Sequence, residues 1–121
     1  MEWLSKVFDF HERVRMLDKE NGRLTHGEME TGEGIIMLAT PTPDYESPKK
    51  HCEHCEQARK WSQVPWIVDG VLVYVNDVYA HYAHAKAAGA TILTDIETDF
   101  PAPRYRAEDL EGHRWMFMQA P

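Results

Sequence analysis

The spacing of hydrophobic positions changes several times along the chain, and each change marks an expected element. Residues 3–8 place apolar side chains at i, i+1, i+4 and i+5, which is the stripe of a helix. Residues 10–17 alternate loosely, as a strand does, and the polar segment 18–22 ends in glycine, as a hairpin turn does. Further strands are predicted at 23–30 and 35–39. The first block is therefore expected to be one helix followed by three strands.

The segment 40–65 interrupts this pattern with four prolines, many charges and little periodicity. It predicts a long connection, with a short helix at 53–61. Long connections inside compact domains are usually functional, interfacial or mobile.

A second block follows the connection. The β-branched run 71–75 predicts a strand, and Asn76-Asp77 predicts the entry to a helix at 78–88 that Gly89 ends. Three more strands are expected, at 91–97, 104–107 and 114–119.

The two blocks match each other when one is moved along the chain by roughly 80 residues. The ends of the two helices then coincide, residues 34–38 lie opposite residues 113–117, and His26 lies opposite Tyr105. Nearly equal offsets across several elements indicate an internal repeat.

Three segments of the second block carry a family resemblance. They are the strand and Asp-capped helix entry at 73–81, the Ala-Gly-Ala stop at 88–90, and the Glu-Asp-x-x-Gly-His-x-Trp ending at 108–115. Together they resemble the second module of the vicinal oxygen chelate superfamily, specifically its glyoxalase-like branch. This superfamily includes glyoxalase I, bleomycin resistance proteins and extradiol dioxygenases.

The resemblance implies an α+β fold in which paired βαβββ modules form a half-open curved barrel. Residues 1–121 are expected to be a single domain, with a first module at 1–40, the long connection at 41–66 and a second module at 67–121. The first module lacks its opening strand, because Met1 already lies in the helix. Either the true start lies upstream, or a partner chain covers the strand edge, or the barrel is open. Family members are commonly homodimers, so a homodimer is expected.

The resemblance also implies where a metal ion would bind. Metal-dependent members use a His on each opening strand and a Glu on each last strand. Here the first His position falls before Met1, the second falls on Gly70, and the Glu positions fall on Met37 and Met116. A thioether is a poor ligand for a hard divalent ion, so no metal and no other cofactor is expected.

Strand alternation then predicts which side chains line the cavity. The candidate ligand-binding residues are Met37, Leu72, Tyr74, Tyr105, Arg114, Met116 and Met118. His26 and Glu28, two residues apart on one strand, are candidates for an acid and base pair, although a solvated strand face would show the same pattern.

Three of these interpretations have plainer alternatives. Arg114 either binds an anionic group of a ligand or pairs with a carboxylate inside the protein. Met37 and Met116 either form an adaptable binding surface or fill a core. The His51–Cys55 segment, with its Cys-x-x-Cys spacing, suits a metal site or is incidental.

Composition excludes several classes of protein. Asp and Glu number 20 against 13 Lys and Arg, so the net charge of −7 lacks the basic footprint of a nucleic-acid-binding protein. The apolar stretches fall short of the roughly 20 residues that span a bilayer, so no membrane partner is expected. No secretory signal is visible at the start, so a cytoplasmic location is expected.

Two functions remain, together with the possibility of a folded but inactive chain. The first is a metal-independent glyoxalase or bleomycin resistance-like protein that binds a small organic molecule in the barrel cavity. The alternative is a metal-dependent lyase, isomerase or dioxygenase of the same superfamily with a relocated site.

Overall fold

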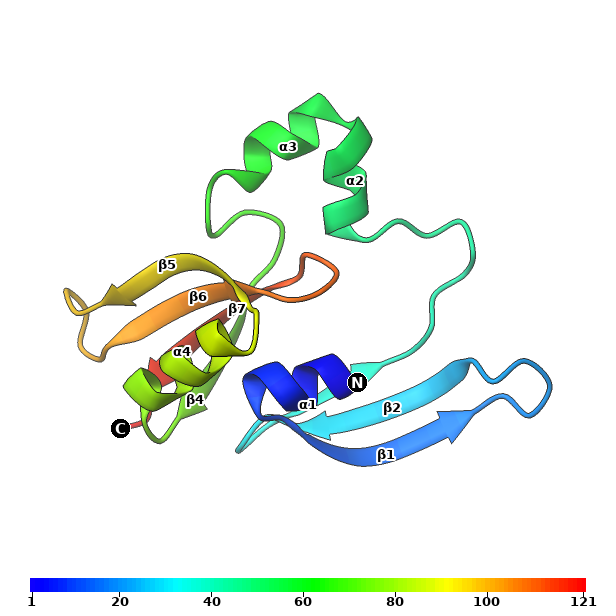
Figure 1. Ribbon diagram of the computed structural model, residues 1–121, viewed down its shortest axis with the longest axis horizontal. Helices are drawn as coiled ribbons and strands as arrows, with labels where there is room; N and C mark the ends of the chain where they lie inside the picture. Colours follow the sequence, from blue (N-terminus) through cyan, green and yellow to red (C-terminus); the bar gives the residue numbers. More distant parts are fainter. The chain divides into compact units, whose positions relative to one another are not determined.

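The computed structural model describes all residues from 1 to 121. The chain divides into two compact units, Met1–Tyr45 and Glu46–Pro121. Each unit has its own sheet and at least one helix (Figure 1). The predicted mixed α+β class is therefore confirmed. None of the helices has the length and apolar character that crossing a bilayer requires.

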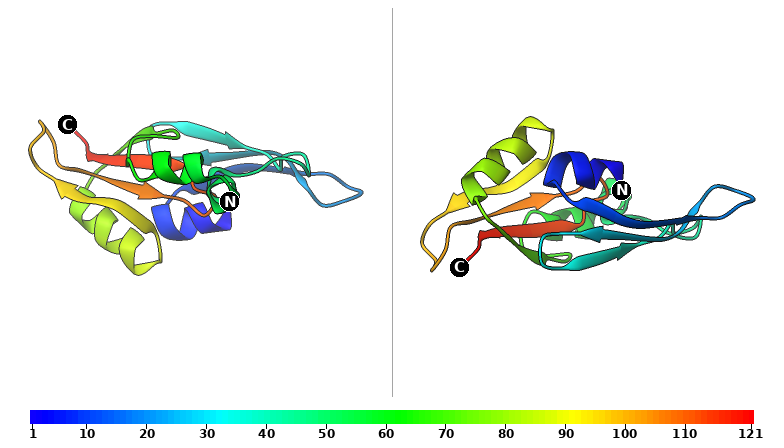
Figure 2. Two further views of the ribbon diagram at one scale, coloured as in Figure 1. Left: turned by 90° about the horizontal axis from the view of Figure 1, so that it is seen from above. Right: turned by 90° about the horizontal axis from the view of Figure 1, so that it is seen from below.

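The first unit begins with helix α1 (Glu2–Phe8) and continues with three antiparallel strands in the order β1-β2-β3. The strands are β1 (His11–Leu17), β2 (Leu24–Glu30) and β3 (Ile35–Leu38). Figure 2 shows α1 over one face of this sheet. Leu4, Val7 and Phe8 of the helix and Met29 of β2 are buried.

The hairpin turn between β1 and β2 forms where the polar segment predicts it. The Asp18 carboxylate accepts hydrogen bonds from the backbone N–H groups of Glu20, at 2.8 Å, and Asn21, at 3.1 Å. Gly22 has a φ of 70°, a left-handed conformation that glycine adopts without strain.

The second unit begins with two short helices, α2 (Pro48–His54) and α3 (Glu56–Ser62), where the sequence predicts one helix at 53–61. The Ser47 side chain accepts from Lys50 N–H and caps α2, and Pro48 suits the first helical turn. Cys55 is extended, with φ of −121°, and separates the two helices.

The rest of the second unit is a four-stranded sheet with one long helix. Its elements are β4 (Val71–Val75), α4 (Val78–Ala87), β5 (Thr91–Glu97), β6 (Arg104–Glu108) and β7 (Arg114–Gln119). The strand order is β4-β7-β6-β5, in which β4 and β7 are parallel and the other pairs antiparallel. As predicted, Asp77 caps α4 by accepting from Ala80 N–H at 3.0 Å.

Helix α4 covers one face of this sheet and forms the core of the second unit with it (Figure 2). Val73, Ala107 and Phe117 of the strands and Val78 and Ala85 of the helix are buried there. The opposite face of the sheet carries no equivalent helix within β4–β7, and the candidate site lies on it.

Candidate ligand-binding face

The candidate site is the face of the second sheet that points away from α4, which we call the open face. Paired residues on neighbouring strands point to the same side of a sheet, so the register identifies its members. Strand β7 lies between β4 and β6, and two of its methionines are paired with a residue of each neighbouring strand. The open face consists of Leu72, Tyr74, Arg104, Arg106, Met116 and Met118.

Four predicted ligand-binding residues come together on the open face. Leu72 pairs with Met116, and Tyr74 pairs with Met118. Leu72 is 48% exposed and Tyr74 is 43% exposed, so both have surface to offer to a ligand. The two methionines are partly buried beside them. Thioether, aryl and alkyl groups of this kind suit a flat organic molecule.

Tyr105 lies on the face covered by α4, contrary to the prediction. It pairs with Phe117, their ring centroids lie 5.2 Å apart, and its side chain is fully buried. Its hydroxyl lies 2.6 Å from Nδ1 of His81 on α4. Burial raises the pKa of the Tyr105 hydroxyl above its usual range, and the neighbouring Tyr82 adds to this effect. Tyr105 is therefore a core residue with a satisfied hydrogen bond.

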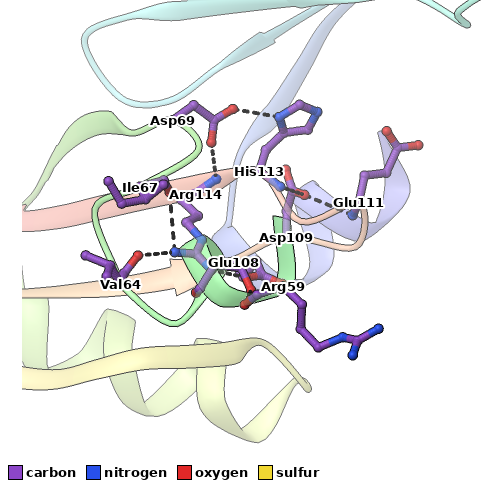
Figure 3. A network of polar contacts seen from close by, with 10 residues as sticks. Arg59, Val64, Ile67, Asp69, Glu108, Asp109, Glu111, His113 and Arg114 are labelled. Carbon is purple, nitrogen blue, oxygen red and sulfur yellow. Dashed lines mark hydrogen bonds and ion pairs between the residues drawn. The ribbon is translucent and has the colours of Figure 1, made fainter. Parts of the chain in front are cut away.

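Arg114 is on the open side of β7, but its side chain is only 4% exposed and serves the protein itself (Figure 3). Its guanidinium donates to the carbonyl oxygens of Ser62, Val64 and Ile67 at 2.5, 2.6 and 3.3 Å. It also contacts the Glu108 carboxylate at 3.1 Å. Of the two interpretations of Arg114, the structure supports pairing inside the protein. The arginine fixes the loop between α3 and β4 against the sheet.

A second contact fixes the end of the same loop. The Asp69 carboxylate accepts from Arg114 backbone N–H at 2.8 Å, and its other oxygen lies 2.7 Å from Nδ1 of His113 (Figure 3). Burial alone would lower the pKa of His113. The hydrogen bond with Asp69 and the charges of Asp109, Asp69 and Glu111 outweigh it, so the pKa of His113 is raised.

This raised pKa makes the loop contact depend on pH. Because the folded state binds the proton more tightly, the stabilisation is complete below about pH 6.5, the ordinary histidine value, and is lost as pH rises through the raised pKa. We expect the His113 ring signals in an NMR titration to report a raised pKa that Asp69→Asn lowers. An unchanged pKa in Asp69→Asn would contradict this assignment.

The remaining predicted residues lie in the first unit. Glu28 and Met37 are paired across β2 and β3, and Met37 is 74% exposed. The His26 Nε2 atom lies 3.0 Å from one oxygen of Glu28, and Nε of Arg13 lies 3.2 Å from the other. His26 and Glu28 thus share a face, as the alternation predicts, but Glu28 is already engaged with an arginine.

The first unit also contains a shallow hollow of about 410 Å³, lined by residues of α1, β1 and β2. Most of its charged groups are already paired. Arg15 lies within 2.7 Å of Glu2 and 2.5 Å of Glu12. None of the residues that line the hollow is a predicted site residue.

The positions that the family resemblance assigns to metal ligands do not fit a divalent ion. Gly70 has no donor, and the Met116 sulfur lies 3.8 Å from a guanidinium nitrogen of Arg104, which is itself a cation. No group of three or more His, Cys, Asp or Glu side chains is arranged to hold a metal ion elsewhere. In the His51–Cys55 segment, Cys52 and Cys55 are free thiols.

Three residues on or beside the open face were not predicted from the sequence: Arg104, Arg106 and Trp66. Arg104 and Arg106 pair with Met118 and Met116, so the correct register of β6 against β7 would have identified them. Trp66 lies in the loop that Arg114 fixes, between the carbonyls of Val64 and Ile67. No pattern in the sequence places that loop.

Comparison with known families gives a match over almost the whole chain. The family model of the Glyoxalase/Bleomycin resistance protein/Dioxygenase superfamily matches residues 1–117. No curated protein gives a significant match.

Solved structures with the same fold include three that share most of their length with this chain. TioX from Micromonospora sp. ML1 is 27% identical with a TM-score of 0.67, and the match covers 99% of this chain and 84% of that chain. TnmS3, an antibiotic binding protein from Streptomyces sp. CB03234, is 12% identical, with a TM-score of 0.63 and coverage of 99% and 83%. A glyoxalase/bleomycin resistance protein from the same Streptomyces strain is also 12% identical, with a TM-score of 0.63 and coverage of 98% and 86%.

Proposed function

Because the chain belongs to the Glyoxalase/Bleomycin resistance protein/Dioxygenase superfamily, we propose that it binds a flat small organic molecule on the open face without a metal ion. The observation that carries the proposal is the exposed apolar strip of Leu72 and Tyr74 beside Met116 and Met118. Exposed aromatic and aliphatic side chains grouped on one face favour association with an apolar partner. TnmS3, which shares the fold, is an antibiotic binding protein, and this supports a binding role.

Metal independence is part of the proposal. The expected ligand positions hold a glycine, which has no side-chain donor, and two methionines, which have only a thioether. The guanidinium of Arg104 also lies against the Met116 sulfur. A lyase, isomerase or dioxygenase reaction through a relocated metal would need a cluster of ligands, and His, Cys, Asp and Glu form no such cluster. The pair His26 and Glu28 is linked to Arg13, which favours a surface ion-pair network over an acid and base pair.

We include a homodimer in the proposal, since the superfamily resemblance implies one. Within the first unit, strand β3 pairs with β2 alone, and an edge strand of this kind can pair with a strand of another chain. Native mass spectrometry of the purified protein reports the subunit count, any bound metal and any organic ligand in one spectrum. A stoichiometric divalent ion that survives buffer exchange would overturn the claim of metal independence.

Binding to the open face is tested with the neutral fluorescent probe N-phenylnaphthylamine. We expect saturable binding that Tyr74→Ala weakens by roughly tenfold, because the variant removes an aromatic surface from the strip. The matched control is Tyr79→Ala on α4, because Tyr79 is 54% exposed but lies on the helix that covers the other face. Fluorescence titration gives both affinities, and equal affinities of wild type and Tyr74→Ala would refute the assigned face.

A further inference from the structure

Two arginines of the open face differ from all others in the chain. The chain has seven arginines, and in five of them the guanidinium forms a hydrogen bond or an ion pair with an oxygen atom of the protein. Arg104 and Arg106 are the exceptions, because neither guanidinium contacts a carboxylate or carbonyl oxygen. The chain has 20 carboxylate side chains and a net charge of −7, so partners for arginine are plentiful. It is therefore unusual that two neighbouring arginines form no ion pair with any of them. The five paired arginines are Arg13, Arg15, Arg23, Arg59 and Arg114.

The Arg104 guanidinium packs against an aromatic ring and a thioether. Its central carbon is 3.3 Å from the centroid of the Phe100 ring, and one terminal nitrogen is 3.8 Å from the Met116 sulfur. Its Nε atom, like that of Arg114, is buried and has no hydrogen-bond partner, but the terminal nitrogens of Arg114 are bonded to oxygen atoms of the protein and those of Arg104 are not. A buried donor without an acceptor is costly, and an acceptor from outside the chain would relieve that cost.

Arg106 is held on the same side of β6. Its backbone N–H donates to the Thr94 hydroxyl at 3.1 Å, and its guanidinium lies 5.9 Å from the centroid of the Trp66 ring. Burial lowers the pKa of Arg106, and the positive charge of Arg104 lowers it further, while Glu97 opposes the shift. The two guanidiniums therefore raise the local positive potential together.

The rings beside the two arginines are aromatic and exposed. Phe100 is 42% exposed and Trp66 is 66% exposed. Arg114 fixes the loop that carries Trp66 by binding the Val64 and Ile67 carbonyls. The arrangement thus combines fixed cationic donors with flat apolar surfaces.

We propose that Arg104 and Arg106 form an anion subsite on the open face that binds the carboxylate, sulfonate or phosphate group of a flat organic ligand. The guanidinium fork matches such planar or tetrahedral anions through charge-assisted hydrogen bonds. The flat part of the ligand then lies on Leu72 and Tyr74, which pair with the same two methionines as the arginines. The inference rests on the proposed function, because it names the chemical class of the ligand of that face.

The test uses two probes with the same ring system, neutral N-phenylnaphthylamine and its anionic analogue anilinonaphthalene sulfonate. We expect wild type to bind the sulfonate at least about tenfold more tightly than the neutral probe, the usual strength of a charge-assisted hydrogen bond. Arg104→Gln and Arg106→Gln, made singly, should each remove most of that preference, measured as the ratio of the sulfonate affinity to the neutral-probe affinity within the same variant. The matched control is Lys60→Gln on α3, an exposed residue whose loss changes the net charge equally.

The outcomes separate this inference from the function on which it rests. If the sulfonate preference survives in both arginine variants, the anion subsite is refuted while binding to the open face stands. If neither probe binds wild type saturably, the proposed function fails together with the subsite. A salt titration of wild type gives a further readout that needs no variant. Raising the NaCl concentration should weaken binding of the anionic sulfonate and leave binding of the neutral probe unchanged, because salt screens interactions between charges.

Discussion

Replacing Arg114 with methionine is expected to lower the free energy of unfolding by about 3–5 kcal/mol, because it removes one partner of a buried ion pair. The Glu108 carboxylate, whose side chain is 18% exposed, loses its counter-charge. The carbonyl oxygens of Ser62, Val64 and Ile67 lose their donor at the same time. Urea unfolding followed by circular dichroism measures the change.

The matched control for this prediction is Arg59→Met. Arg59 also donates to two backbone carbonyls, those of Cys52 and Glu53, but it is exposed, so its loss is expected to cost less than about 1 kcal/mol. The double variant Arg114→Met with Glu108→Leu should recover part of the loss, because no buried charge is then left unpaired. Equal stabilities of Arg114→Met and Arg59→Met would show that the arginine does not fix the loop.

Gly112→Ala is expected to lower the free energy of unfolding by about 2–4 kcal/mol, through backbone strain and a lost hydrogen bond. Gly112 has a φ of 90°, and a Cβ atom there would lie 2.7 Å from the backbone nitrogen of Lys49. That nitrogen donates to the Glu111 carbonyl at 3.0 Å, a contact that joins the start of α2 to the β6–β7 turn. The atoms nearest to the added Cβ belong mainly to the backbone of Lys49, so the clash can be relieved only if the start of α2 moves.

Gly89→Ala separates the two causes in this prediction. Gly89 has a φ of 103°, but nothing lies within 4 Å of its added Cβ, so only backbone strain remains. Thermal unfolding of both variants should therefore show a smaller loss for Gly89→Ala. A loss as large as that of Gly112→Ala would mean that the contact with Lys49 contributes nothing.

The strands and the long helix could be predicted from the sequence because their local patterns agree with their tertiary roles. The β-branched run 71–75 forms β4 over the same residues, and the Asp-capped helix predicted at 78–88 ends one residue earlier, at Ala87. The helices α2 and α3 were harder to predict from the sequence, because their apolar side chains show only a weak helical periodicity. The informative signals there were Ser47 and Pro48 at the start of α2.

The facing of individual side chains could be predicted only where the register between strands was known. Alternation along one strand relates Met116 to Met118 but says nothing of how β6 aligns with β7. One residue of misalignment placed Tyr105 on the open face and left Arg104 and Arg106 out of consideration. Arg114 was placed on the correct side, but its partners come from a loop some 50 residues away in sequence, which no local pattern reveals.

The parallel pairing of β4 with β7 has a consequence for how the protein is made. Helix α4 and strands β5 and β6 all lie between these two strands in the chain. Strands β5, β6 and β7 can join through short connections, whereas β4 must wait for a long loop to close. On the ribosome, β4 therefore emerges with its hydrophobic run 71–75 unpaired, and it remains so until β7 has been synthesised. During this interval the nascent chain exposes an unpaired apolar strand, and exposed strand edges of this kind are prone to aggregation.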